Sequence, residues 1–543
     1  MATSNTDSLV LFALSAKNHR AERVLSHPEN RHLISTRADG QLTFDIGFPL
    51  RGQSPTTLAT LGRGTNADIF VEGSNISRVQ CSFEVDLDTG IVMFYDRSHG
   101  STSQVFGKDA TPFEFGRPRK VVVQESLNTI IGMGGERCDL FLFELDWRHE
   151  PSGTTHAIKR YGAFPGTRKQ HPRITRTVDE APTELPSHRE TRLHTPGSLV
   201  LKIRYIKLGK IGSGSFGEVH KAIDVDSGKV MAVKILRRPQ DLSRRHVWKE
   251  TVALSLKREI EILSGISHPN VVNYIASQGW FDSDVEIFMG LKEGTLESLI
   301  GNGADATTVA DNAFPHMLRA LDCIAFKDII HRDVKPENIL YVLNASGEYQ
   351  FQLGDFGCCN RAVEAATISG TPMFMAPEVH KGERQSCKAD IWSLFVTMLW
   401  TLDVNGFRHT HFKSMEQVWT AVSCALSSTA LSRLSEMAVV NPLQRASAAQ
   451  MLVKLFHGKG LSTPLKQVPA LHSNSVVAAD DDSKAMVRNP PDLAARDAIH
   501  HKQVRERLDP AGLQRKAPMD VAHVRKRRTP VQMKLAKVGH TKC

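Results

Sequence analysis

Gly212-Ser-Gly-Ser-Phe-Gly-Glu-Val219 is a glycine-rich run in the middle of this 543-residue chain. Strand-like residues lie on both sides of it, so it predicts the turn of a β-hairpin. Its glycines let the backbone approach a triphosphate closely, with main-chain N–H groups directed at the oxygen anions. A dinucleotide-binding turn has the same glycine spacing but leads into a helix, whereas a strand follows here. The predicted nucleotide-binding residues are Ile211, Gly212, Ser213, Gly214, Ser215, Phe216, Gly217, Glu218, Val219 and Lys234.

Three further motifs follow in order: Ala232-Val-Lys234, His331-Arg-Asp-Val-Lys-Pro-Glu-Asn338 and Asp355-Phe-Gly357. The lysine of the first lies in an apolar strand, where an unpaired ammonium is costly to bury. Glu259, on a helix-like run, is the candidate partner of this lysine. Glu261 is less favoured because it lies two positions further along the run, and side chains two positions apart in a helix point to different faces. Such an ion pair would hold the lysine against the phosphates of a nucleotide.

The second and third motifs carry the groups that phosphoryl transfer to a hydroxyl requires. Asp333 is predicted to orient the attacking hydroxyl and accept its proton, and Lys335 to neutralise charge on the phosphoryl group. Asn338 and Asp355 offer the oxygen ligands that Mg²⁺ prefers. The predicted catalytic residues are Asp333, Lys335, Lys234 and Glu259. The sequence therefore predicts ATP and Mg²⁺ as cofactors.

Through these motifs, residues 204–457 resemble a eukaryotic protein kinase domain. The resemblance implies a two-lobed α+β fold, with a small strand-rich lobe before a larger helical one. Lys335 and the run Gly370-Thr-Pro-Met-Phe-Met-Ala-Pro-Glu378 are similar to the serine/threonine branch of that family. The implied reaction is transfer of the ATP γ-phosphate to protein Ser or Thr hydroxyls. The implied buried contacts are Thr371 with Asp333 and Lys335, Glu378 with Arg445, and Asp390 with the catalytic loop.

The same resemblance predicts a switch in the activation segment, residues 355–378. Arg332 directly precedes the catalytic aspartate and needs an anion, which a phosphorylated residue of this segment commonly provides. Thr371 is committed to the catalytic loop, so Thr367 and then Ser369 are the predicted phosphorylation sites. The alternative is a short segment that is ordered without phosphate.

Residues 8–146 contain short strand-like runs separated by turn residues, which predicts an all-β sandwich. Leu61-Gly-Arg63, Ile76-Ser-Arg-Val-Gln80 and Asp96-Arg-Ser-His-Gly-Ser-Thr102 resemble a forkhead-associated (FHA) domain, a phosphothreonine-binding sandwich. An arginine beside hydroxyl and amide donors suits a dianionic phosphate. The implied phosphopeptide contacts are Arg63, Ser77, Arg78 and His99. Gln80 replaces a structural histidine of that family and His99 replaces an asparagine, so a sandwich kept for dimerisation or tethering is the alternative.

The remaining segments, 147–203 and 458–543, are predicted to be a disordered linker and a disordered basic tail. Residues 501–543 hold twelve Lys or Arg and three Asp or Glu, so the tail supplies +9 of the net charge of +10. Direct nucleic-acid binding is therefore not expected, and 525–528 is an import signal, a patch for an acidic partner or part of a solvated tail. The chain also lacks apolar runs that could cross a membrane, which predicts an intracellular protein.

Two functions follow from these predictions. The first is an active serine/threonine kinase that its FHA-like unit recruits to phosphothreonine-containing proteins, as in checkpoint or meiotic kinases of the nucleus. The second is a pseudokinase scaffold that acts as a phosphopeptide-binding adaptor. Scaffolds commonly lose the clamp lysine, the catalytic aspartate or the metal aspartate, and Lys234, Asp333 and Asp355 are all present. The enzyme is therefore the favoured prediction.

Overall fold

The computed structural model describes residues 9–48, 54, 56–148, 201–214, 217–238, 257, 260–280, 284–344, 346–361 and 370–471. They belong to one compact unit of the chain. Within these ranges no helix has the length and apolar character that crossing a membrane requires. Among the described residues, Cys81, Cys138, Cys323, Cys387 and Cys424 carry free thiols.

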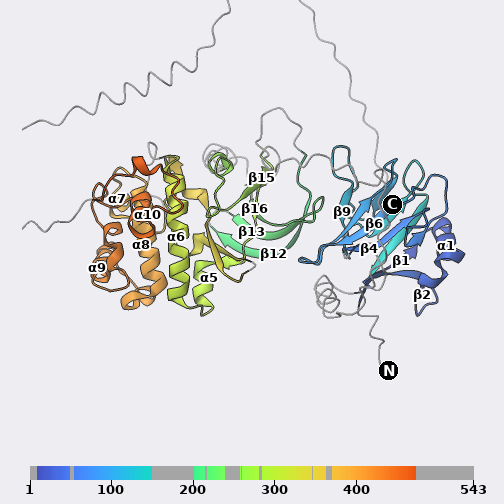
Figure 1. Ribbon diagram of the computed structural model, residues 1–543, viewed down its shortest axis with the longest axis horizontal. Coiled ribbons are helices and arrows are strands. Elements are labelled where there is room, and N and C mark those ends of the chain that lie inside the picture. Colours follow the sequence, from blue (N-terminus) through green and yellow to red (C-terminus); the bar gives the residue numbers. More distant parts are fainter. Residues whose placement is uncertain are drawn as a thin grey trace, which may run out of the picture. The chain divides into compact units, whose positions relative to one another are not determined.

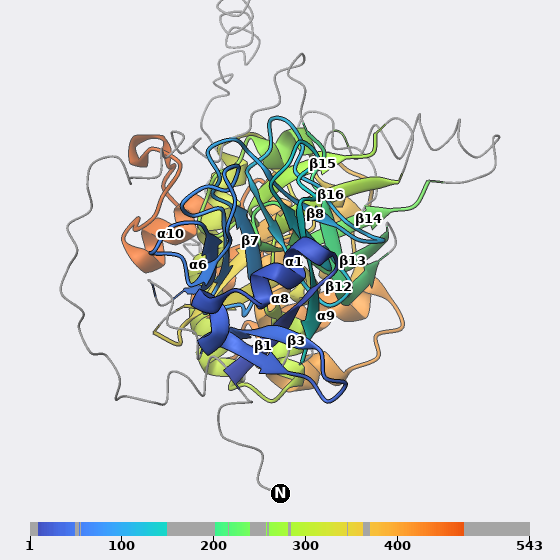
Figure 2. The ribbon, with the colours of Figure 1, turned by 90° about the vertical axis from the view of Figure 1, so that its right-hand side faces the viewer.

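The N-terminal part is β-rich, as predicted, and consists of two sheets. The six strands of the first sheet, in spatial order, are β2 (Ile34–Thr36), β3 (Leu42–Gly47), β1 (Val10–Ala16), β11 (Phe141–Trp147), β10 (Ile130–Met133) and β8 (Ser103–Phe106). The second sheet has the order β5 (Ile69–Phe70), β4 (Thr57–Gly62), β6 (Cys81–Val85), β7 (Val92–Asp96) and β9 (Lys120–Val122). Helix α1 (His19–Leu25) packs on the first sheet beside β1 and β3, followed by the 3₁₀ helix η2 (Pro28–Leu33) (Figure 2).

One apolar core holds these two sheets together. Alternate residues of the strands point inward because side chains of a strand alternate between its faces. Phe12 of the first sheet contacts Phe83 of the second edge to face, with ring centroids 5.0 Å apart. Phe94 and Phe143 are also fully buried in this core. The arrangement is a β-sandwich, in agreement with the fold class expected for 8–146.

The small lobe that follows is an antiparallel sheet of β12 (Tyr205–Gly214), β13 (Gly217–Asp224), β14 (Val230–Leu236), β16 (Val285–Gly290) and β15 (Tyr274–Gln278), in that order (Figure 1). The hairpin predicted around the glycine-rich stretch is present. Gly212 pairs with Val219 across β12 and β13, and Lys234 pairs with Val219 across β13 and β14. The predicted nucleotide-binding stretch and the predicted clamp lysine therefore lie on three neighbouring strands.

The larger lobe is mainly helical (Figure 1). Its α-helices are α5 (Leu296–Gly301), α6 (Ala306–Ala325), α7 (Pro377–His380), α8 (Lys388–Leu402), α9 (Met415–Ala425) and α10 (Ala448–Phe456). Its short strands are β17 (Gly294–Thr295), β18 (Ile329–Ile330), β19 (Ile339–Leu343), β20 (Tyr349–Leu353) and β21 (Asn360–Arg361). Its 3₁₀ helices are η4 (Pro336–Asn338), η5 (Phe356–Cys358), η6 (Pro372–Phe374), η7 (Val404–His409), η8 (Ser432–Met437) and η9 (Leu465–Gln467).

Helices α6 and α8 form the centre of this lobe. Helix α6 begins at the N-cap Asp305, whose side chain accepts the Thr308 N–H, and its apolar face packs on α8, α10 and β20. Nearly all of α8 is buried, and its Thr397 and Thr401 hydroxyls donate to backbone carbonyls one turn back. Because this core is continuous with β19 and β20, the loop between β18 and β19 is held on rigid elements.

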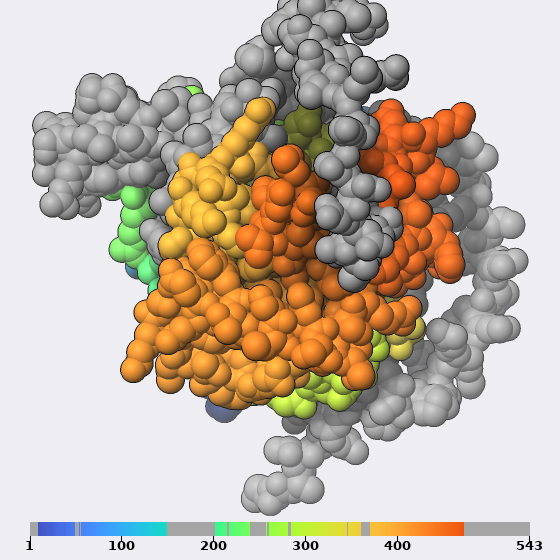
Figure 3. All heavy atoms as spheres, turned by 90° about the vertical axis from the view of Figure 1, so that its left-hand side faces the viewer, coloured from blue at the N-terminus to red at the C-terminus, as the bar shows by residue number. Residues whose placement is uncertain are grey.

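The described chain continues past residue 457, where the larger lobe was expected to end and the tail to begin. Asp322 of α6 is buried and accepts the backbone N–H groups of Ser462 and Thr463 at 2.6 and 3.0 Å. Gln450 of α10 donates to the carbonyls of Pro469 and Ala470. Residues 458–471 are thus part of this lobe, and their red-orange atoms lie on its surface in Figure 3.

Candidate functional site

Asp333, in the loop between β18 and β19, is the most heavily contacted of the predicted catalytic residues. Its Oδ1 accepts the backbone N–H and the hydroxyl of Thr371 at 3.0 and 2.8 Å. Its Oδ2 accepts the Asn338 amide at 2.9 Å and lies 3.0 Å from Lys335 Nζ. Lys335 also donates to the Thr371 hydroxyl at 2.6 Å. The structure therefore brings together four of the residues singled out in the sequence.

The backbone before Asp333 is held by a buried carboxylate. Asp390 of α8 accepts the N–H groups of His331 and Arg332, both at 2.8 Å. Arg332 has φ +67°, a conformation that costs a non-glycine residue energy and persists only when its surroundings enforce it. His331 is fully buried, and its Nε2 lies 2.9 Å from the Gly354 carbonyl. These contacts fix the direction in which the loop presents Asp333.

Lys234 of β14 reaches across to the larger lobe. Its Nζ donates to Asp355 Oδ1 at 2.8 Å, and only about a tenth of the lysine side chain is exposed. Burial alone would raise the pKa of Asp355, but the adjacent ammonium outweighs it and holds that pKa below its ordinary value. The predicted partner of Lys234, Glu259, lies outside the described residues.

The glycine-rich hairpin shows two different reasons for its glycines. A Cβ at Gly217, which has φ +151°, would lie 2.2 Å from the Ile235 carbonyl oxygen, so packing against β14 requires glycine there. A Cβ at Gly212 would meet only Val219, at 4.0 Å. The protein's own packing does not demand glycine at 212, and the open space above it fits a closely approaching phosphate. Ile211 beside it keeps an apolar side chain 52% exposed.

Of the other predicted nucleotide-binding residues, two are not described by the structure and one forms ion pairs within the protein. Ser215 and Phe216 lie outside the described residues. The Glu218 carboxylate is engaged by Lys210 and Arg237 at 3.1 and 3.2 Å, a cross-strand network that the sequence analysis missed. The hydrogen bond from Lys210 is the main reason that the pKa of Glu218 falls to about 2. Glu218 is therefore held by charged neighbours on β12 and just after β14.

Two side chains fit a Mg²⁺ site. Asn338 is buried and directs its amide nitrogen at Asp333, so that its oxygen is the atom left for a cation. Asp355 has φ +51° and keeps about two fifths of its side chain exposed. Among the described residues no group of three or more His, Cys, Asp or Glu could form a metal cage by itself. Two oxygen donors are what Mg²⁺ uses when substrate phosphates and waters complete its shell.

The end of the activation segment is locked to the larger lobe. Glu378 and Arg445 form two hydrogen bonds of 2.7 and 2.9 Å, with both side chains essentially unexposed. A Cβ at Gly370, φ +115°, would lie 2.2 Å from the Arg332 carbonyl oxygen. Arg332 itself donates from Nε to the Cys358 carbonyl. The predicted phosphorylation sites, Thr367 and Ser369, lie outside the described residues.

The predicted phosphopeptide contacts gather at one end of the sandwich. Arg63 follows β4, and its Nε donates to the Ile76 carbonyl at 2.5 Å. Its backbone N–H donates to the Ser77 carbonyl at 3.0 Å, and the His99 N–H donates to the Ser77 hydroxyl at 3.2 Å. Arg63, Arg78 and His99 are exposed. The loops after β4, before β6 and after β7 thus present basic side chains around one hydroxyl.

Gln80, noted in the sequence as a departure, braces these loops. It is fully buried, and its oxygen accepts the Ser77 N–H at 2.9 Å. Its amide nitrogen donates to the hydroxyls of Thr102 and Ser103, both at 2.9 Å. A glutamine has both an acceptor and two donors, so it satisfies both loops at once. A single sequence offers no signal for this role, because the role depends on groups more than twenty residues away.

Comparisons with known proteins address the middle of the chain. Residues 205–457 match the family model described as protein kinase domain. Mitogen-activated protein kinase kinase kinase 3 of Arabidopsis thaliana is 32% identical over 205 residues, covering 36% of this chain and 31% of the relative. Serine/threonine-protein kinase fused of Drosophila melanogaster is 32% identical over 198 residues, covering 35% and 23%. The chain spans less than half the length of either relative. The family match does not extend to the N-terminal sheets.

Proposed function

Residues 205–457 are a protein kinase domain with serine/threonine kinase relatives, and we propose that this domain transfers the γ-phosphoryl group of ATP to serine and threonine hydroxyls of proteins. The observation that carries the proposal is the environment of Asp333. Four donors, two of them from Thr371, fix both oxygens of this carboxylate. A carboxylate held in one orientation beside a lysine suits a reaction that depends on positioning and charge stabilisation.

In the proposed reaction Asp333 accepts the proton of the substrate hydroxyl. The hydroxyl oxygen bonds to the γ-phosphorus while the bond between that phosphorus and the β–γ bridging oxygen breaks, which releases ADP. Lys335 shifts from Asp333 Oδ2 to the phosphoryl oxygens as the phosphate chain enters, because these carry more negative charge. The shift leaves Oδ2 for the hydroxyl, while Thr371 continues to hold Oδ1. Lys234 binds the phosphates from the small lobe.

Asn338 and Asp355 are the residues that would hold Mg²⁺. Bound there, the cation would neutralise charge on the phosphates and on the departing ADP. The contact between Lys234 and Asp355 places the phosphate-binding lysine beside this metal position. Both groups would therefore act on one phosphate chain.

A radiolabelled-phosphate assay of the full chain against a peptide array tests this function. Asp333→Ala should abolish most transfer to Ser and Thr peptides. Asp311→Asn, which changes an exposed aspartate of α6, is the matched control and should behave like the wild type. Equal transfer by wild type and Asp333→Ala would assign the activity to a contaminating enzyme and overturn the proposal.

We further propose that the N-terminal sandwich is an FHA-like domain that recruits the kinase to phosphothreonine-containing proteins. Its support is the exposed cluster of Arg63, Arg78 and His99 around Ser77, on loops that Gln80 holds together. Arginine with hydroxyl and backbone donors is a common way to bind a phosphate dianion. A checkpoint role stays a prediction. Entry into the nucleus also stays a prediction, because the candidate import signal at 525–528 lies outside the described residues.

Binding of phosphothreonine peptides to the full chain tests recruitment. A phosphothreonine peptide library should bind, the same library without phosphate should not, and Arg63→Ala should remove most of the difference. Arg31→Ala, which changes an exposed arginine elsewhere on the sandwich, serves as the control. Equal binding of both libraries would favour a sandwich that acts in tethering or dimerisation.

A further inference from the structure

The turn that joins β13 to β14, residues 224–229, has the sequence of an exposed hairpin turn but is covered by the sandwich. Val225 in this turn is 1% exposed, and with Ile223 it belongs to the apolar core of the sandwich. The Val122 N–H, at the end of β9, donates to the Val225 carbonyl at 2.9 Å. A strand of the sandwich and a turn of the small lobe therefore share a backbone hydrogen bond and an apolar core.

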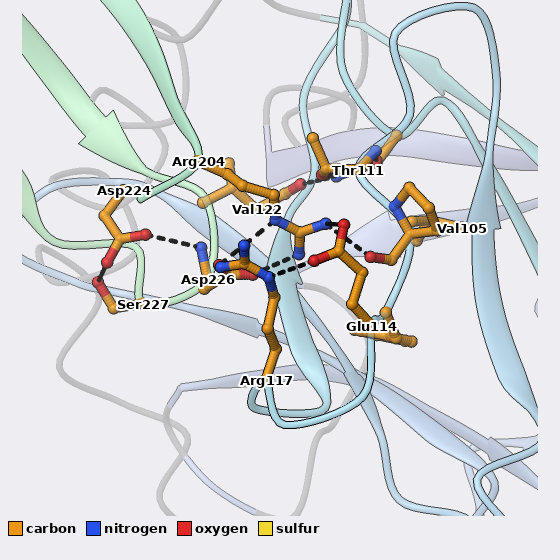
Figure 4. A network of polar contacts seen from close by, with 12 residues as sticks. Val105, Thr111, Glu114, Arg117, Val122, Arg204, Asp224, Asp226 and Ser227 are labelled. Atoms are coloured by element: carbon orange, nitrogen blue, oxygen red, sulfur yellow. Dashed lines mark hydrogen bonds and ion pairs between the residues drawn. The ribbon is translucent and has the colours of Figure 1, made fainter. Parts of the chain in front are cut away.

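Asp226, the next residue of the turn, is the centre of a buried ionic cluster. Arg117 of the sandwich donates from Nη1 to its Oδ2 at 2.8 Å, and Arg204, just before β12, donates from Nη2 to its Oδ1 at 2.5 Å. Figure 4 shows the two guanidinium groups converging on this carboxylate, with Glu114 close by. Only 9%, 14% and 11% of the side chains of Arg117, Arg204 and Asp226 are exposed. We call these three residues the Asp226 clamp.

Each arginine of the clamp also donates a hydrogen bond to a backbone carbonyl on the other side of the contact. Arg117 of the sandwich also donates to the Lys202 carbonyl beside the small lobe at 2.9 Å. Arg204 of the small lobe also donates to the Pro112 carbonyl of the sandwich at 2.6 Å. Each guanidinium therefore bridges the same two parts of the chain. Arginine suits this role because its planar fork holds several acceptors in fixed directions.

Apolar packing alone would leave this contact loose. A cavity of about 370 Å³ lies at the contact, and its lining includes Ile91 and Trp147 from the sandwich and Leu208 and Val230 from the small lobe. Apolar contact is non-directional. The orientation of the turn is therefore set by the clamp and by the backbone hydrogen bond of Val122.

The position of the turn matters because β13 connects it to the nucleotide site. The strand begins at Gly217, in the glycine-rich hairpin, and ends at Asp224, where the turn begins. A paired strand transmits position along its length because its backbone is fixed by ladders on both sides, here to β12 and β14. Fixing one end of β13 therefore restrains the other end, which borders the predicted phosphate-binding turn.

We propose that the Asp226 clamp docks the sandwich on the small lobe and thereby positions the glycine-rich hairpin for ATP. The proposal rests on the proposed function, because it assigns Asp226 and Arg117 as positioning residues for the same nucleotide site. The sandwich then has two roles: peptide recognition at the Arg63 end and support of the small lobe through the clamp.

The test uses the full chain with Asp226→Asn, Arg117→Gln, the double variant and the control Asp45→Asn. Asp45, on β3 of the sandwich, forms an ion pair of similar length with Arg148, at 2.5 Å, but this pair is more exposed and does not contact the small lobe. Each clamp variant should weaken ATP binding about fivefold or more, the lower range of coupling between sites, and raise KM for ATP with little change in kcat. The loss of ATP affinity in the double variant should be smaller than the product of the two single losses, because both substitutions remove the same contact between Arg117 and Asp226.

Hydrogen exchange at Val122 supplies a readout that needs no ATP. Its amide should be protected in the wild type and in Asp45→Asn, and should exchange faster in Asp226→Asn. Fast exchange in the wild type, or ATP binding that is equal in clamp and control variants, would overturn the proposal. The two readouts are separable. If the Val122 amide is protected but the wild-type chain binds no ATP, the docking contact stands, whereas the proposed function and the positioning role are both contradicted.

Discussion

Thr371 donates both its backbone N–H and its hydroxyl to a single carboxylate oxygen of Asp333, at 3.0 and 2.8 Å. The two residues are 38 positions apart, and Thr371 belongs to the end of the activation segment. Gly370 lets this end approach the catalytic loop, because any Cβ there would collide with the Arg332 carbonyl. Docking of the activation segment and orientation of the Asp333 carboxylate are therefore one structural event.

Substitutions of Thr371 should show whether its hydroxyl positions Asp333 or only stabilises the fold. Thr371→Ala removes the hydroxyl that contacts Asp333 and Lys335, and we expect kcat to fall on the order of 10²-fold, the cost of a small misplacement of a catalytic group. Thr371→Ser keeps that hydroxyl and should retain most activity. Steady-state kinetics and thermal unfolding of both variants check this. A Thr371→Ala enzyme with normal kcat would show that the contact does not orient Asp333.

Two glycines of the same hairpin should respond differently to a methyl group. Gly217→Ala forces a Cβ to within 2.2 Å of the Ile235 carbonyl oxygen and should lower the melting temperature. Gly212→Ala meets open space in the structure, so stability should change little while KM for ATP rises. Differential scanning fluorimetry and ATP titrations of the two variants measure these effects. Equal ATP affinity in Gly212→Ala and wild type would argue against phosphate contact at that position.

The ion pair between Glu378 and Arg445 should be structural. Glu378→Gln leaves a fully buried guanidinium without its charge partner, which typically costs about 3–5 kcal/mol of unfolding free energy. Glu436→Gln is the comparison, because the pair of Glu436 with Lys454 is about 30% exposed and such pairs contribute about 0–1 kcal/mol. Urea unfolding of both variants gives the values. Similar losses in the two would mean that the Glu378 pair is accessible to solvent.

Stability should depend on pH through Asp390. Burial raises the pKa of this carboxyl to about 7, far above its value in an unfolded chain. The folded state then retains a proton that the unfolded state has released, so this stability is fully present below about pH 4 and lost as the pH rises through about 7. Relative to Asp390→Asn, the wild type should lose stability between about pH 4 and pH 7. A difference between the two that stays constant over this range would place the pKa of Asp390 near its ordinary value.

The sequence predicted the elements whose pattern is local. The hairpin around Gly212 was predicted from alternation and turn chemistry, and the structure has strands on both sides of it. The contacts of Thr371 and the pair of Glu378 with Arg445 were implied by the resemblance to kinases, and both are present. Local sequence pattern was therefore enough to predict the hairpin, and the order of the motifs was enough to predict the contacts around the catalytic loop.

Contacts that depend on distant segments were not predictable in this way. Asp226 stands in a polar turn, and its burial depends on Arg117, 109 residues earlier in the chain. Gln80 departs from the FHA pattern that the sandwich sequence resembles, and only the positions of Thr102 and Ser103 reveal that it fulfils a bracing role. The larger lobe extends beyond 457 because Asp322 needs donors, which residues 462 and 463 supply. Each case turns on a buried polar group whose partner is remote in sequence.

We propose that Lys234, Asp333 and Asp355 act as one constellation in phosphoryl transfer, and a kinetic cycle of single and combined substitutions measures whether they do. The measurement is kcat for phosphate transfer by the full chain, for Lys234→Met, Asp333→Ala, Asp355→Ala and their combinations, with Asp311→Asn as the control. Each single change should reduce kcat by roughly 10²-fold or more. The combinations should be about as slow as the slowest single variant, because residues that act together give strongly non-additive losses. Losses that multiply, or an Asp333→Ala variant that keeps more than about a tenth of the wild-type rate, would contradict the assignment.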